Sequence, residues 1–74
     1  MRIIDLSGPE GNAFNIMGMA YNWCIQLADI DPEKFNEVQL REDFDNCKTY
    51  KEILDTFDKY FETMADYEFL NDPR

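Results

Sequence analysis

The sequence predicts an α+β fold: a single small domain over residues 1–74, in which three helices pack on a two-stranded sheet formed by the chain ends. The length is the first observation, because 74 residues suffice for one domain only. The composition is the second, since 45% hydrophobic residues are too many for a disordered chain. The third is the order of local patterns, which is strand, helix, helix, helix, strand.

Turn residues and apolar periodicity predict the first strand and the first helix. Arg2 to Leu6 is a short β-branched run, and the turn formers at 7–11 close it. Asn12 is a good N-cap for a helix over 13–28. Apolar side chains cover an arc of roughly 200° around this helix, about twice that of an ordinary surface helix. The helix is therefore either the buried centre of the domain, or an element that packs on its own domain by one flank and on a partner by the other.

The second helix is predicted to be short and weak. The segment 31–33, Asp-Pro-Glu, combines an N-cap residue, a proline at the first helical position and an acid in the first turn. These signals predict a helix over 32–40. Its expected core-facing pair is Phe35 and Val38. An acidic loop is expected to follow over 41–46.

The third helix has the most regular pattern. Thr49 and Glu52 form a capping box, and apolar residues then recur at helical spacing. This stripe predicts the core face of the helix: Tyr50, Ile53, Leu54, Phe57, Phe61 and Met64. Residues 67–70 alternate as in a closing strand, and 71–74 are expected to fray. An isolated two-stranded sheet is marginal in water, so the helices must cover it, and its open edges offer a second copy a place to pair.

Charge and composition exclude several classes of function. The chain has 16 Asp and Glu against 7 Lys and Arg, a net charge of −9, so the phosphate backbone of nucleic acid would repel it. It has no histidine, which removes the commonest general base near neutral pH and the commonest zinc ligand. So small a domain is not expected to hold a deep pocket that shifts the pKa of paired carboxylates such as Asp43 and Asp45. We therefore expect a binding protein and not an enzyme, without cofactor or metal.

The N-terminus and the cysteines indicate a compartment. An acid already occurs at position 5, so the apolar stretch before it is too short to be the apolar core of a secretory signal. The longest uncharged run, residues 12–28, contains Asn15, Asn22 and Gln26 in its interior and falls short of a membrane span. A cytoplasmic location is therefore expected, with Cys24 and Cys47 reduced.

The acidity is concentrated in the segment from Asp29 to Asp45. This segment carries seven acids against two bases, Lys34 and Arg41, and so has a net charge of −5. A surface of this kind attracts a positively charged groove, such as those of nucleic-acid-processing proteins. A solvated face that only aids solubility would carry the same charge. The candidate partner-binding residues are Asp29, Asp31, Glu33, Glu37, Glu42, Asp43 and Asp45.

A second candidate surface lies on the flanks of the first helix. Tryptophan and methionine are enriched at protein interfaces, although they also serve as core residues. Met19, Trp23 and Ile25 are therefore either core packing or the interface of a homodimer.

A set of short motifs resembles a family of small acidic proteins of phages and mobile elements. The motifs are Ile4-Asp5-Leu6 with Gly8, Gly11-Asn12-Ala13-Phe14, Met17-Gly18, Gln26-Leu27 and Phe57-Asp58-Lys59-Tyr60-Phe61. The resemblance carries no catalytic residue. What it implies is origin, since small phage proteins of this size often act against host defence by binding.

Charge and resemblance together predict a phage-encoded anti-defence inhibitor of the anti-CRISPR or anti-restriction type, present in the host cytoplasm. Its expected partner is a host protein or ribonucleoprotein complex with a basic groove, with no direct contact to nucleic acid or membrane. The alternative is a small structural or regulatory homodimer whose charge serves solubility. A third hypothesis is a dimer whose cleft sequesters a small ligand.

Overall fold

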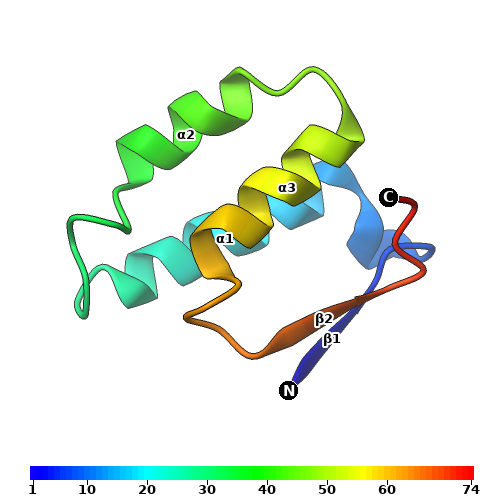
Figure 1. Cartoon of the computed structure of the whole chain (residues 1–74), viewed down its shortest axis with the longest axis horizontal. Coiled ribbons are helices and arrows are strands. Elements are labelled where there is room, and N and C mark those ends of the chain that lie inside the picture. The colour runs from blue at the N-terminus through cyan, green and yellow to red at the C-terminus, as the bar shows by residue number, and fades with distance from the viewer.

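The computed structural model describes all 74 residues and has the predicted class and element order (Figure 1). Strand β1 (Arg2–Asp5) leads through the short 3-10 helix η1 (Pro9–Gly11) into helix α1 (Ala13–Leu27). Helices α2 (Glu37–Asp45) and α3 (Tyr50–Phe61) follow, and strand β2 (Tyr67–Leu70) closes the chain. The prediction of three helices and a two-stranded sheet made by the chain ends is confirmed.

The sheet is parallel, and the three helices supply the long crossover connection that a parallel pair requires. The Arg2 amide donates to the Asp66 carbonyl at 2.9 Å, and the Leu6 amide donates to the Leu70 carbonyl at 3.0 Å. Ile4 lies opposite Phe69 in the register and is fully buried. Side chains alternate along a strand, so the helices cover one face of the sheet and the other is open to water.

An aromatic cluster around Phe57 joins α1, α3 and β2. Its ring centroid lies 5.2 Å from that of Trp23, 4.9 Å from Phe61, 5.1 Å from Tyr67 and 5.4 Å from Phe69. Phe57 has no exposed surface. Aromatic rings bury large apolar areas, so this cluster holds the closing strand and both long helices together.

The second helix begins five residues later than the sequence predicts, so the predicted helix range of 32–40 is wrong. Helix α2 begins at Glu37 because the Asn36 side chain caps it, accepting hydrogen bonds from the amides of Val38 at 2.9 Å and Gln39 at 3.2 Å. Asparagine is as good an N-cap as aspartate, and the true cap lies five residues beyond the predicted one.

The predicted start at Asp31 produces a single turn and no more. The Asp31 side chain accepts from the Lys34 amide at 3.2 Å, and its carbonyl accepts from the Phe35 amide at 3.0 Å. Phe35 then enters the core, where its ring stacks on that of Phe61 at 5.8 Å. Burial of this ring redirects the chain before a second turn can form.

The segment 41–46, predicted as an acidic loop, is helical as far as Asp45. Its register is set by Leu40 and Phe44, which are both buried. Val38, expected on the core side, is 69% exposed. The spacing of four residues between Leu40 and Phe44 places both on one face, and that face packs inward.

Helix α3 ends at Phe61. The predicted apolar stripe continues to Met64, three residues further. The amides of Met64 and Ala65 both donate to the Phe61 carbonyl, at 3.0 and 2.9 Å, which closes the helix with a turn. Met64 is therefore 39% exposed and is not part of the core.

The C-terminal residues 71–74 do not fray, contrary to the prediction. The Arg74 guanidinium forms ion pairs with Asp55 at 2.9 Å, Asp58 at 2.8 Å and Asp72 at 2.6 Å. Two of these acids belong to α3, so the end of the chain is fastened to that helix. The pKa of Arg74 is raised, chiefly by its hydrogen bond to Asp72.

Candidate interaction surface

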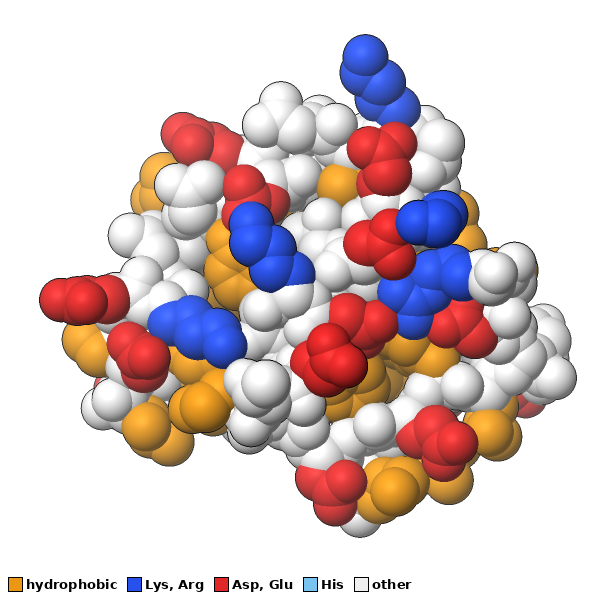
Figure 2. All heavy atoms as spheres, in the orientation of Figure 1, with side chains coloured by type: hydrophobic (Ala, Val, Ile, Leu, Met, Phe, Trp, Pro, Cys, Tyr) orange, Lys and Arg blue, Asp and Glu red, His pale blue; other side chains and the backbone are white.

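The acidic segment forms one margin of the molecule. Asp29, Asp31 and Glu33 lie in the connection between α1 and α2, and the remaining acids lie on α2 itself (Figure 1). This margin is away from the sheet and from both chain ends. Figure 2 shows acidic side chains toward that margin with Lys or Arg side chains close to them, and a further group of Lys and Arg among acids on the other side of the same face.

Five of the seven predicted binding residues are exposed: Asp29, Glu33, Glu37, Glu42 and Asp45. We call these five residues the acidic edge. Within it, the only ion pair is that of Glu37 with Arg41, at 3.8 Å between Oε1 and Nη2. The other four carboxylates make no hydrogen bond or ion pair with the chain. On α2, Glu42 and Asp45 are three residues apart and lie on the side away from the buried Leu40 and Phe44.

The remaining two predicted residues have structural roles. Asp31 caps the turn described above, and Asp43 accepts hydrogen bonds from the Tyr60 hydroxyl and from the Gln39 amide at 3.1 Å. Asp43 lies on the flank of α2 that faces α3, with Lys59 nearby. The structure therefore separates these two carboxylates from the acidic edge.

The Asp43–Tyr60 bond shifts the pKa of both partners. The hydrogen bond from Tyr60 lowers the pKa of Asp43 below its ordinary value of 3.8. Burial, and then the bond to Asp43, raise the pKa of Tyr60 above its ordinary value of 10.0. A lowered carboxyl pKa stabilises the fold above the ordinary value, and this contribution is lost as the pH falls below about 4. A raised tyrosine pKa stabilises the fold below about pH 10, and this contribution is lost as the pH rises further.

Tyr60→Phe is therefore expected to lower the free energy of unfolding by about 1–2 kcal/mol at neutral pH. It is also expected to flatten both the acid and the alkaline decline of stability. Urea unfolding between pH 3 and 11 measures both effects. Tyr21→Phe is the matched control, because the Tyr21 hydroxyl makes no hydrogen bond. Equal pH profiles for Tyr60→Phe and the parent protein would show that the bond contributes nothing.

The three candidate interface residues of α1 lie in different environments. Trp23 packs into the aromatic cluster, with ring centroids 5.5 Å from those of both Phe61 and Tyr67. Met19 is half-buried and packs against the core. Ile25 is 57% exposed and points away from it. The structure thus gives core packing to Trp23 and leaves Ile25 available to a partner.

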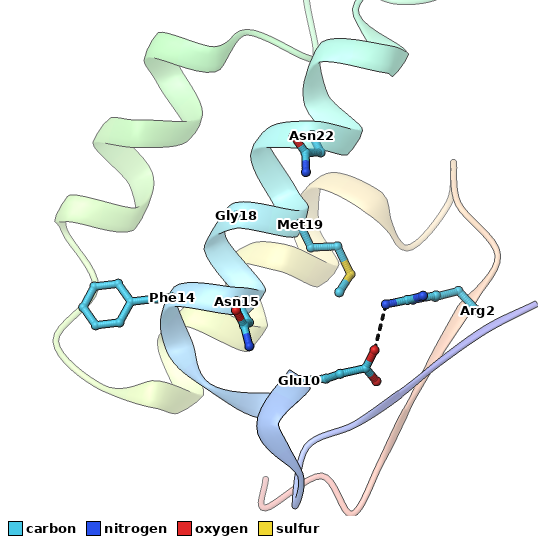
Figure 3. A pocket seen from close by; sticks show the side chains of 7 residues that line it. All are labelled: Arg2, Glu10, Phe14, Asn15, Gly18, Met19 and Asn22. Carbon is cyan, nitrogen blue, oxygen red and sulfur yellow. Dashed lines mark hydrogen bonds and ion pairs between the residues drawn. The ribbon is translucent and has the colours of Figure 1, made fainter.

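The largest cavity is a shallow groove of about 480 Å³ between α1 and the start of β1 (Figure 3). Arg2 and Glu10 form an ion pair across its floor at 2.9 Å. Met19 and the amides of Asn15 and Asn22 lie on its α1 side. The groove is open to water and its charges neutralise each other, so it lacks the unpaired buried groups of a typical ligand site.

Sequence reasoning missed the Arg74 cluster and this groove. Arg74 follows a proline at the end of the chain, and no local pattern predicts that its guanidinium reaches three acids. The groove depends on how α1 lies beside β1, which is a tertiary arrangement.

No three Cys, Asp or Glu side chains gather in a way that could hold a metal ion. No helix is long and apolar enough to cross a membrane.

Comparisons of the chain with protein-family models, curated proteins and solved structures find no match. The resemblance to small acidic phage proteins therefore stays a prediction.

Proposed function

We propose that this protein is a non-enzymatic, phage-encoded inhibitor of host defence whose acidic edge occupies a basic groove in a nucleic-acid-binding complex. The complex is of the CRISPR or restriction type, and the protein acts in the host cytoplasm. The observation that carries the proposal is the set of exposed carboxylates over residues 29–45, four of which have no partner in the chain.

Electrostatics supports such a partner. A groove that binds nucleic acid presents Lys and Arg to phosphates, and the carboxylates of the acidic edge offer it the same sign of charge. Opposite fields also accelerate the encounter of the two proteins. A competitor of this kind binds the groove without itself touching nucleic acid, in agreement with the net charge of −9.

The local structure of the edge favours binding. Glu37, Glu42 and Asp45 are held on a helix that is capped by Asn36 and anchored by Leu40 and Phe44. Their backbone is therefore ordered before a partner arrives, which reduces the entropy lost on association.

The groups with strongly shifted pKa values support a binding role over a catalytic one. All three act in structural contacts: Tyr60 with Asp43, Tyr67 with Asp58, and Arg74 with two acids of α3 and with Asp72. None of them lines the largest groove, and the smaller hollows that they do line are those made by these same contacts. The perturbed groups thus serve the fold.

The decisive variant reverses the three α2 acids of the edge, Glu37→Lys, Glu42→Lys and Asp45→Lys. It spares Asp43, whose reversal would break the bond to Tyr60. The three side chains are exposed, so the variant is expected to fold. Its affinity for the partner captured by the parent protein is expected to fall by at least about 100-fold, because attraction becomes repulsion. Capture from a bacterial lysate that contains defence complexes, followed by titration of the purified partner, measures this loss.

The matched control carries Glu62→Lys, Asp66→Lys and Glu68→Lys, which change the net charge equally. These acids are also exposed but lie near β2, outside the acidic edge. The control is expected to retain most of the affinity. Equal loss in both variants would show that only net charge matters, and unchanged affinity in the edge variant would refute the proposed surface.

A further inference from the structure

Helix α1 carries an exposed line of residues that the proposed function does not use. Its members are Phe14, Gly18, Tyr21 and Ile25, spaced by four, three and four residues. This is the spacing of the contact seam between two packed helices. Phe14 is 79% exposed and Ile25 is 57% exposed, while Tyr21 is half-buried against Phe44 with ring centroids 6.0 Å apart. We call these four residues the α1 seam.

Two members of the seam, Phe14 and Gly18, also line the largest groove, on its α1 side. In Figure 3 the ring of Phe14 projects away from the Arg2–Glu10 pair, whereas the side chain of Met19 points toward Arg2. Beyond its own helix, an ideal Cβ placed on Gly18 meets no atom within 4 Å, so this position faces open space. A partner's side chain can therefore approach the α1 backbone closely at Gly18.

The charge distribution limits what can cover this seam. No charged residue occurs from Asn12 to Ala28, although the chain as a whole carries a net charge of −9. Two copies that met through the acidic edge would bring like charges together. Helix α1 itself adds no charge to the seam, and the Arg41 guanidinium lies beside it, 6.0 Å from the centre of the Tyr21 ring. Two acidic copies therefore meet at the α1 seam with less like-charge repulsion than at the acidic edge.

The seam is also complementary to itself. In an antiparallel pair related by a two-fold axis between positions 18 and 21, Phe14 of one copy faces the partner's Ile25. Gly18 then faces the partner's Tyr21, so that a large side chain meets the position that has none. A two-fold interface requires this reciprocity, in which each residue meets the same counterpart from both sides.

We propose that two copies of this protein associate through the α1 seam, with their α1 helices antiparallel. A helix of 15 residues is roughly 22 Å long, so the contact is at the small end of specific interfaces. The dimer therefore exchanges with monomer, and its dissociation constant lies in roughly the micromolar range.

Sedimentation velocity over a range of protein concentrations tests this association. Phe14→Glu and Ile25→Glu each add one negative charge to the seam of each copy, so the dimer interface gains two. Each variant is therefore expected to raise the dissociation constant of the dimer at least about 10-fold. Met64→Glu is the control, because Met64 is exposed in the turn after α3 and adds the same charge elsewhere. A parent protein that stays monomeric up to about 1 mM, or a control that weakens the dimer equally, would overturn the proposal.

A charge pair tests the antiparallel orientation. In the double variant Phe14→Lys with Ile25→Glu, the introduced lysine faces the partner's introduced glutamate at both ends of the seam. Dimerisation is expected to recover relative to either single variant, and to weaken with salt. A parallel pair would set like charges against each other, so a double variant weaker than both single variants refutes this register. Circular dichroism of each variant shows whether the monomer remains folded.

Discussion

Replacing Phe57 by alanine is expected to unfold a large share of the protein at room temperature. The ring is fully buried and contacts four other aromatic residues from three elements. Removing a buried phenylalanine costs about 3–5 kcal/mol, through lost transfer energy and the cavity left behind. A chain of 74 residues has a total stability of roughly 4–11 kcal/mol, so this loss is a large part of it. Urea unfolding followed by circular dichroism gives the difference.

Phe14→Ala is the control for this effect. It removes the same atoms from a ring that is 79% exposed, so the free energy of unfolding is expected to change by less than about 1 kcal/mol. Similar losses for Phe57→Ala and Phe14→Ala would mean that the aromatic cluster is not the core of the fold.

Gly11→Ala is expected to destabilise the fold by about 3 kcal/mol, although it adds only one methyl group. Gly11 is buried at the end of η1, where the backbone of Leu6 passes directly beside it. A Cβ at this position would lie 2.5 Å from both the Leu6 carbonyl carbon and its Cα atom. These are backbone atoms held by the pairing of β1 with β2, so they cannot turn aside as a flexible side chain would. Thermal unfolding measures the shift in melting temperature.

Gly18→Ala is the matched substitution with the opposite expected sign. Gly18 lies inside α1, and its added Cβ meets nothing within 4 Å. Alanine favours a helix over glycine by about 0.5–1 kcal/mol, so the variant is expected to be more stable than the parent. The comparison is made at a protein concentration below that of dimer formation. A loss of stability in Gly18→Ala, or none in Gly11→Ala, would contradict this packing of the chain.

The helices that could be predicted from the sequence are those whose local signals agree with their packing. Asn12 caps α1 by accepting from the Phe14 amide, and Thr49 caps α3 by accepting from the Glu52 amide, as expected. The second helix differs because two N-cap residues compete. Asp31 and Asn36 both cap a turn, and burial of Phe35 between them decides which turn continues.

Tertiary contacts explain the remaining differences. Arg74 fastens the chain end to two acids on α3 that are 16 and 19 residues away, a distance at which local patterns carry no signal. Likewise, the acidic segment was predictable from its composition, but the separation of Asp43 from it was not. That separation depends on Tyr60, which approaches Asp43 only because α2 packs beside α3.

The most direct test of the acidic edge is competition between this protein and nucleic acid for the captured partner. Fluorescently labelled nucleic acid is bound to the purified partner, and the protein is then added while anisotropy is followed. The proposal predicts complete displacement by the parent protein and little by the variant with Glu37→Lys, Glu42→Lys and Asp45→Lys. A stable ternary complex, in which the partner holds nucleic acid and this protein together, would contradict it.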